Sequence, residues 1–273
     1  MSWHTFIERP QPADHAVQIY DELDELAHSV GHFLLAGFES GAPAVVIATA
    51  EHRARFSDEL EHEGADAGVL ERRGQLIIRD ADETLASFMA GELPSAERFD
   101  AVVGRLIDDV ASRFPGRTMR VFGEMVDVLW ARGQRQAAVA LEQLWNALAE
   151  QRSFALLCGY HLDIFDLDVQ TGALPDVFGA HSHARPTADP SRLAAAVDRA
   201  LVESVGPRAA AYIYLDVAEQ MHLDKVPRAQ ALLTRLSATN RTLARTVLER
   251  AQTHFTHGRM QRVQRAAQNS APV

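Results

Sequence analysis

Cysteine is almost absent from this sequence: among its 273 residues, only Cys158 is a cysteine. A single cysteine excludes a disulfide within the chain and fits a reducing compartment. Long apolar runs are missing as well. No stretch approaches the roughly 20 apolar residues that a membrane-spanning helix needs, and residues 1–14 lack the apolar core of a signal peptide. We therefore expect a soluble, cytoplasmic protein that does not enter a membrane.

Lysine is equally rare, because Lys225 is the only lysine beside 26 arginines. The Walker A motif requires a glycine-rich turn followed by lysine and serine or threonine, since backbone amides and the lysine neutralise the phosphates. Lys225 lies between Asp224 and Val226, and no such turn precedes it. The sequence thus excludes hydrolysis of nucleoside triphosphates by a classical P-loop, although it leaves nucleotide binding by other means open.

The charge is unevenly distributed along the chain. Residues 190–273 contain 12 basic and 6 acidic residues, a net charge of +6. The whole chain carries −10, so the remainder carries −16, since −16 + 6 = −10. With 47% hydrophobic residues, a chain of this length can bury the core of one large domain with an appendage. The sequence predicts an acidic body followed by a basic tail.

Apolar runs alternate with amphipathic segments over the first 165 residues. The run 44–49 is continuous and β-branched, as in a strand covered on both faces. We expect four strands, at 44–49, 75–80, 119–122 and 154–158. We expect helices between and around them, at 21–40, 51–63, 84–90, 96–114, 126–132 and 136–151. This alternation predicts an α/β fold, a three-layer and mostly parallel sheet.

The pattern changes after residue 166. Residues 167–190 are rich in glycine and proline and are interpreted as a connector. Helical spacing returns over 191–257, which predicts a small all-α module, and the polar segment 258–273 is expected to be disordered. The domain proper is predicted to span 15–166.

Several pairs of metal-ligating residue types are present, but none completes a zinc signature. The pairs are His28 with His32, Glu51 with His52, Glu61 with His62, and His181 with His183. We interpret these histidines as surface residues and predict no metal site.

Polar residues follow the predicted strands where they end, and ligands of such sheets bind beyond the carboxyl ends of the strands. Glu124 is interpreted either as a site residue or as a carboxylate favouring the dipole of the next helix. Cys158 ends an apolar strand and is interpreted either as a buried core residue or as a nucleophile. Glu142 and Asn146 share one helix face at i,i+4, and Trp145 is a core residue or an aromatic wall.

Six segments resemble one known family: HAVQIYDE, FLLAGFESGAPAVVIATAEHR, GQLIIRDADETLASFMAGELPSAERF, RVFGEMVDVLWARG, ALEQLWNAL and FALLCGYHLDIF. Together they are similar to the MEDS domain, the sensory domain shared by methanogen and methylotroph regulators, including the dichloromethane-responsive repressor. The resemblance runs from about His15 to Phe165. It implies a core similar to RecA and KaiC that lacks the phosphate-binding loop.

The resemblance also implies a sensor of hydrocarbon derivatives that acts in signal transduction or transcription regulation. Its signature positions are here predicted to bind the ligand: His15, Tyr20, Glu124, Glu142, Trp145, Asn146, Cys158 and Tyr160. We expect a small organic effector, no catalytic residues and an unknown cofactor. The basic tail would bind a signalling partner protein, a neighbouring subunit of a homo-oligomer, or DNA. An enzyme that uses Glu124 and Cys158 on a small substrate remains the alternative.

Overall fold

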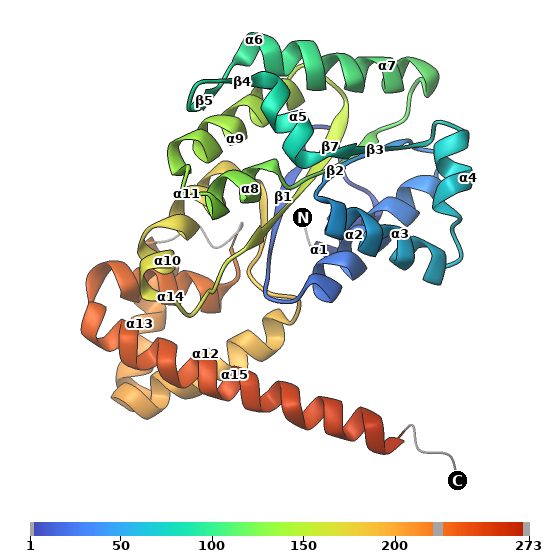
Figure 1. Ribbon diagram of the computed structural model, residues 1–273. Helices are drawn as coiled ribbons and strands as arrows, with labels where there is room; N and C mark the ends of the chain where they lie inside the picture. Colours follow the sequence, from blue (N-terminus) through green and yellow to red (C-terminus); the bar gives the residue numbers. More distant parts are fainter. Residues whose placement is uncertain (1–2, 221–225, 270–273) are drawn as a thin grey trace. The chain divides into compact units, whose positions relative to one another are not determined.

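The computed structural model describes residues 3–220 and 226–269 (Figure 1). The chain divides into two compact units. The first contains Met1–His161 and Gly179–Ala184, and the second contains Leu162–Phe178 and Arg185–Val273. Lys225 and residues 270–273 lie outside the described residues.

The first unit is built on one six-stranded sheet with the order β3-β2-β6-β7-β1-β8. Its strands are β1 (His15–Tyr20), β2 (Ala44–Ala48), β3 (Leu76–Asp80), β6 (Met119–Gly123), β7 (Phe154–His161) and β8 (His183–Arg185). The pairs β1–β7, β7–β6, β6–β2 and β2–β3 are all parallel. The four expected strands are therefore confirmed, and so is the α/β class.

Strands β1 and β8 of this sheet were not predicted from the sequence, and β1 is the longer of the two. All six of its residues are buried, yet His15 and Gln18 interrupt the apolar run that would have indicated a strand. Gln18 is accommodated because its side-chain amide donates to the carbonyl of Glu25 at 3.2 Å. Because β1 lies between β7 and β8, it brings His15 beside two strands distant in sequence.

Two groups of helices cover the sheet (Figure 1). One group comprises α1 (Trp3–Glu8), α2 (Leu23–Glu39), α3 (Ala50–His62) and α4 (Ala67–Arg72). The other comprises α5 (Ala81–Phe88), α6 (Ala96–Phe99), a π-helical turn (Asp100–Gly104), α7 (Arg105–Arg113), α8 (Met125–Ala131) and α9 (Arg135–Ala149). A small hairpin of β4 (Met89–Ala90) and β5 (Leu93–Pro94) joins α5 to α6. With helices on both faces, the sheet is buried, as its apolar strands require.

The second unit is helical. It contains α10 (Leu167–Thr171), most of α11 (Ala173–Ala180), α12 (Pro190–Val205), α13 (Pro207–Gln220), α14 (Arg228–Thr239) and α15 (Arg241–Asn269). The helical C-terminal part was expected. The segment 167–190 is more ordered than a connector, because Asp166 caps α10 with bonds from the amides of Asp168 and Val169. Helix α15 continues to Asn269, past residue 257 where helix was expected to end.

A buried arginine ties the helices of one face to the central strand β6. Arg120 is 3% exposed. Its guanidinium donates to the carbonyl of Glu8 at 2.7 Å and to that of Ile7, and it lies 5.0 Å from the ring centre of Phe33. Burial lowers the pKa of Arg120 to about 10. Gly37 of α2 leaves the space that this side chain needs, because a Cβ there would lie 2.6 Å from Arg120 Cδ.

We predict that Gly37→Ala destabilises the protein by about 1–3 kcal/mol, because the added methyl group would displace Arg120. Gly179→Ala in α11 is the control, since nothing lies within 4 Å of its Cβ position. The control should change the free energy of unfolding by less than about 1 kcal/mol. Chemical denaturation of both variants measures this. Equal stability of Gly37→Ala and the native chain would contradict the packing described.

Candidate functional site

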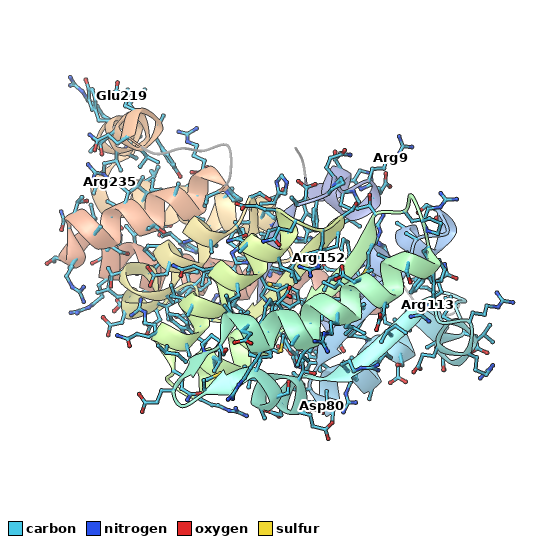
Figure 2. The ribbon with its side chains drawn as sticks, turned by 90° about the horizontal axis from the view of Figure 1, so that it is seen from above. Arg9, Asp80, Arg113, Arg152, Glu219 and Arg235 are labelled. Carbon is cyan, nitrogen blue, oxygen red and sulfur yellow. The ribbon has the colours of Figure 1, made fainter. Side chains whose placement is uncertain are left out.

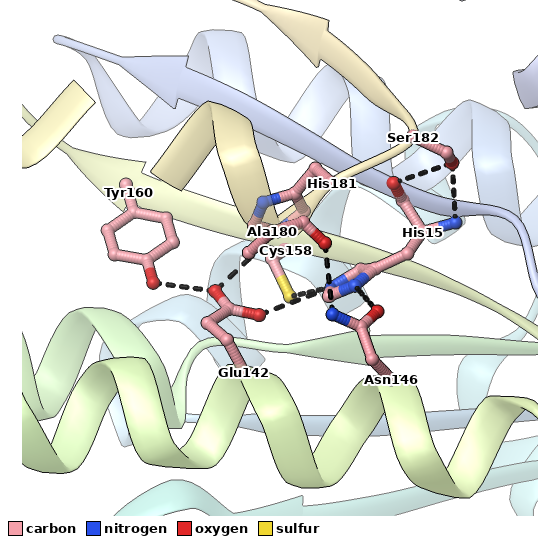
Figure 3. Close-up of polar contacts among 8 residues, drawn as sticks. All are labelled: His15, Glu142, Asn146, Cys158, Tyr160, Ala180, His181 and Ser182. Atoms are coloured by element: carbon pink, nitrogen blue, oxygen red, sulfur yellow. Dashed lines mark hydrogen bonds and ion pairs between the residues drawn. The ribbon is translucent and has the colours of Figure 1, made fainter. Parts of the chain in front are cut away.

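Apart from Trp145, which is a core residue, the predicted site residues fall into two groups within the first unit. One group lines a pocket of about 620 Å³, here called the strand-end pocket. Its walls are Tyr20, Asp21, Leu23, Thr49, Ala50, Glu51, His52, Glu124, Asp127, Val128, Trp130, Ala131 and His161. The other group is the buried cluster of His15, Glu142, Asn146, Cys158, Tyr160 and His181 (Figure 3). The single site expected from the sequence is therefore two neighbouring groups.

Glu124 holds the floor of the strand-end pocket together. It lies between β6 and α8 and is 2% exposed. One carboxylate oxygen accepts from the backbone amide of Thr49, and the other contacts Nδ1 of His52. Neither oxygen caps α8. The sequence had left open that Glu124 interacts with the dipole of this helix. Instead, the carboxylate accepts from the amide of Thr49, the residue before α3, and so lies near the positive end of that helix dipole.

A second carboxylate joins β1, α8 and β7 at the same edge. Asp127 accepts the hydroxyl of Tyr20 at 3.3 Å and the backbone amide of His161 at 3.1 Å. Burial, with neighbouring Glu124, raises the pKa of Asp127 to about 6. Burial and the nearby Asp127 also raise the pKa of Tyr20. Tyr20 therefore remains a neutral hydrogen-bond donor at neutral pH.

The expected polar end of β3 takes no part in this pocket. Asp80 lies at the carboxyl end of β3 (Figure 2), where it accepts from the amide of Glu83 and caps α5. Its other oxygen accepts from Arg53 Nη2 at 2.8 Å. Asp80 is thus occupied by structural contacts.

The contact with Glu124 favours the charged form of His52. Burial opposes the charged form, but the hydrogen bond and the negative charge of Glu124 outweigh it and raise the pKa of His52. A histidine whose pKa is higher in the folded than in the unfolded chain stabilises the fold fully below pH about 6.5. That contribution is lost as the pH rises through the folded-state pKa.

We predict that His52→Gln lowers the free energy of unfolding by about 1 kcal/mol near pH 6, after allowance for solvent screening. The difference from the native chain should shrink as the pH rises through the folded-state pKa of His52, because the native chain then loses the charged pair. Urea denaturation across this range measures it. His62→Gln, an exposed position on the same helix, should show no such trend. A difference that does not vary with pH would contradict the charged pair.

In the buried cluster, His15 is held in one orientation. Asn146 donates its side-chain nitrogen to the carbonyl of Ala180 at 3.0 Å, so its oxygen faces His15 Nδ1 at 2.9 Å. Burial, and then the neighbouring His181, lower the pKa of His15 to about 3. A neutral His15 donates its Nδ1 proton to Asn146, so Nε2 carries the lone pair. This nitrogen lies 3.3 Å from Cys158 Sγ and 3.4 Å from a Glu142 oxygen.

Glu142 lies at the centre of this cluster. Tyr160 donates its hydroxyl to Oε1 at 2.6 Å, and His181 Nε2 lies 3.6 Å from the same oxygen. Oε2 accepts no hydrogen bond from the part of the chain that the structure describes. Burial raises the pKa of Glu142, an effect that His15 and Tyr160 partly offset.

Cys158 is fully buried, and burial together with the nearby Glu142 raises the pKa of its thiol. A nucleophilic cysteine needs the reverse, an accessible thiol with a lowered pKa. Glu124 and Cys158, the pair of the enzyme alternative, contact different partners, the first His52 and the second His15. The structure therefore does not bring these two residues into one catalytic pair.

Trp145 is a core residue. It is 1% exposed and packs edge-to-face against Phe99 and Phe154, with ring centres 5.2 and 6.2 Å apart. Trp130, which was not predicted as a site residue, lines the strand-end pocket instead and contacts Tyr160 at 6.3 Å. The aromatic wall expected from Trp145 is thus provided by Trp130.

The interpretation of the histidines as surface residues is wrong for His181, which is 1% exposed, and for His52, whose side chain is 15% exposed. His28, His32 and His62 are on the surface as expected. His181 is buried because the amide of the next residue, Ser182, donates to the carbonyl of His15 at 2.7 Å. His52, Asp127 and His161 line the pocket but were not among the predicted site residues. Each lies at or shortly after the carboxyl end of a strand, which was the available signal.

The comparison with known families identifies this arrangement. Residues 14–176 match the MEDS family, described as the methanogen/methylotroph, DcmR sensory domain. The match covers more than half of the chain, so the chain belongs to the MEDS family. It extends beyond residue 166, where the domain was expected to end, and includes α10 and the start of α11.

Among solved structures, the chain is similar to a KaiC-like protein from the hyperthermophilic archaeon Pyrococcus horikoshii. That protein is 17% identical, with a TM-score of 0.37, and the similarity covers 55% of this chain and 62% of that one. This chain therefore spans less than two thirds of that protein's length. None of the curated proteins matches the chain. Within the described residues, no helix combines the length and apolar character needed to cross a membrane.

Proposed function

We propose that this chain is a cytoplasmic signal-sensing regulator that binds a small neutral or cationic organic effector in the strand-end pocket. The observation that carries the proposal is the pocket itself. It lies at the carboxyl ends of parallel strands, where ligands of such sheets bind, and about 620 Å³ suits a small organic molecule. The family is a sensory one, which supports the same role.

The short strand-to-helix connections argue against a nucleotide. Only Asp21 and Glu22 separate β1 from α2, and only Thr49 separates β2 from α3. A phosphate-binding loop needs several residues whose amides surround the phosphates. Neither connection has that length, and the first carries two carboxylates. We infer that ATP is neither bound nor hydrolysed here.

The charge of the pocket selects among other ligands. Four carboxylates line it: Asp21, Glu51, Glu124 and Asp127. The charge of Glu124 is compensated by His52. Glu51, which is exposed at the start of α3, contributes its negative charge to the pocket wall. Anions would be repelled, whereas an alcohol could hydrogen-bond to these groups and an amine would gain a favourable charge interaction. The rings of Tyr20 and Trp130 add apolar and cation–π surface.

We predict that short-chain alkyl amines and alcohols raise the melting temperature, by about 3 °C for binding worth about 1 kcal/mol. Carboxylates of equal chain length and ATP with magnesium should have no effect. Glu51→Gln should weaken the response to amines and leave that to alcohols unchanged. Glu61→Gln on the same helix, outside the pocket, is the matched control. Stabilisation by carboxylates or ATP that depends on Glu51 would overturn the proposed pocket chemistry.

We further propose that the helical second unit transmits the signal by contacting a protein. Tyr212 and Leu215 lie three residues apart on α13 and are 61% and 58% exposed. Residues at this spacing share a helix face, and exposed large apolar residues favour a protein contact. The described basic residues beyond 190 are spread over four helices, and within residues 190–220 and 226–269 we recognise no helix-turn-helix.

We therefore predict that the full chain shows no submicromolar binding to a random DNA duplex at about 0.15 M salt. Fluorescence anisotropy with a labelled duplex measures this, with a salt titration as the control for weak charge-driven contact. Submicromolar binding that falls steeply with salt would instead make DNA the output partner.

A further inference from the structure

We propose that His15, Glu142, Cys158 and His181 form a site for one divalent metal ion of the zinc type. The four side chains belong to different segments: β1, α9, β7 and the residues between α11 and β8. The proposal does not depend on the effector pocket, because none of the four residues lines it.

The spacing of the donor atoms carries the proposal. One donor atom from each side chain lies within 4.8 Å of the other three. His15 Nε2 is 3.3 Å from Cys158 Sγ and 3.4 Å from Glu142 Oε2, and His181 Nε2 is 3.6 Å from Glu142 Oε1. A tetrahedral ion with bonds of 2.0–2.3 Å separates its ligand atoms by about 3.3–3.8 Å. The separations of His15 Nε2 from Cys158 Sγ and from Glu142 Oε2 fall within that range. The distance from His181 is to the other oxygen of the same carboxylate.

The chemistry of the donor atoms agrees with their spacing. His15 Nε2 and Glu142 Oε2 both present lone pairs to the same point, and Oε2 accepts no hydrogen bond from the described residues. Facing lone pairs in a buried space repel one another unless a proton or a cation lies between them. Two imidazole nitrogens, a thiolate and a carboxylate are a donor set that zinc accepts in proteins.

The surrounding residues orient these ligands as the outer contacts of a metal site do. Asn146 accepts from His15 Nδ1 and is itself fixed by the carbonyl of Ala180. Tyr160 donates to Glu142 Oε1 and leaves Oε2 directed into the cluster (Figure 3). Such partners set the tautomer of a ligating histidine and the direction of a ligating carboxylate.

The burial of the cluster indicates what the ion would do. His15, Glu142, Cys158 and His181 are each at most 3% exposed. Four protein ligands complete a tetrahedral shell, so no position remains for a water or a substrate, which is typical of a structural zinc site. The ion would fasten the segment Gly179–Ala184 to the sheet, a contact between residues 15 and 181.

The test uses the full chain after removal of metals with a chelator, titrated with Co²⁺ and then Zn²⁺. We expect one equivalent of Co²⁺ per chain, with intense visible bands of tetrahedral cobalt and a near-ultraviolet thiolate charge-transfer band. Zn²⁺ should displace it. Cys158→Ser should remove the charge-transfer band, and Tyr160→Phe should weaken Co²⁺ binding about 10–100-fold through loss of ligand orientation. His62→Gln is the control and should bind like the native chain.

Circular dichroism of each variant establishes that it is folded. Because the native chain supplies the stoichiometry and both bands by itself, a variant that fails to fold does not affect the test. Absence of stoichiometric binding by the native chain at micromolar Co²⁺ or Zn²⁺ would overturn the proposal. So would a charge-transfer band that persists in a folded Cys158→Ser chain.

Discussion

A carboxylate removed from water must be compensated by hydrogen bonds or by opposite charge. Glu142 is such a carboxylate, buried in the interior of the first unit. Three elements around Glu142 supply polar groups to it. Strand β7 supplies the hydroxyl of Tyr160, β1 supplies His15, and the segment after α11 supplies His181. A change at any of these positions therefore alters the electrostatic balance of all of them, as expected for a polar network in a medium of low dielectric constant.

Glu124 is also a buried carboxylate, but its compensating partners are of a different kind from those of Glu142. Its partners are a backbone amide and a histidine, and both lie at the edge of a pocket that solvent reaches. The partners of Glu142 are side chains from the interior. The sheet thus carries two compensated carboxylates, of which one lies at a pocket that solvent reaches and the other among side chains of the interior.

The sheet was largely predictable because continuous apolar runs identify strands buried on both faces, as in β2 and β6. Strand β1 was not predicted because the polar residues His15 and Gln18 break up its apolar sequence. The i,i+4 spacing correctly placed Glu142 and Asn146 on one helix face, where Asn146 contacts His15. No local pattern could bring His181 to the same point, since its position depends on the return of the chain after α11. The family resemblance identified most of the site residues, but it did not indicate that they divide between the strand-end pocket and the buried cluster.

The path of the chain between the two units has a consequence for dissecting the protein. The chain leaves the first unit after His161, returns for Gly179–Ala184 and leaves again at Arg185. No single cut can therefore yield both units intact. A fragment that ends at His161 loses the strand β8 and His181, and one that begins at Leu162 retains residues that belong to the other unit. The first unit is complete only once residue 184 has been synthesised, although most of it is made much earlier, as Met1–His161.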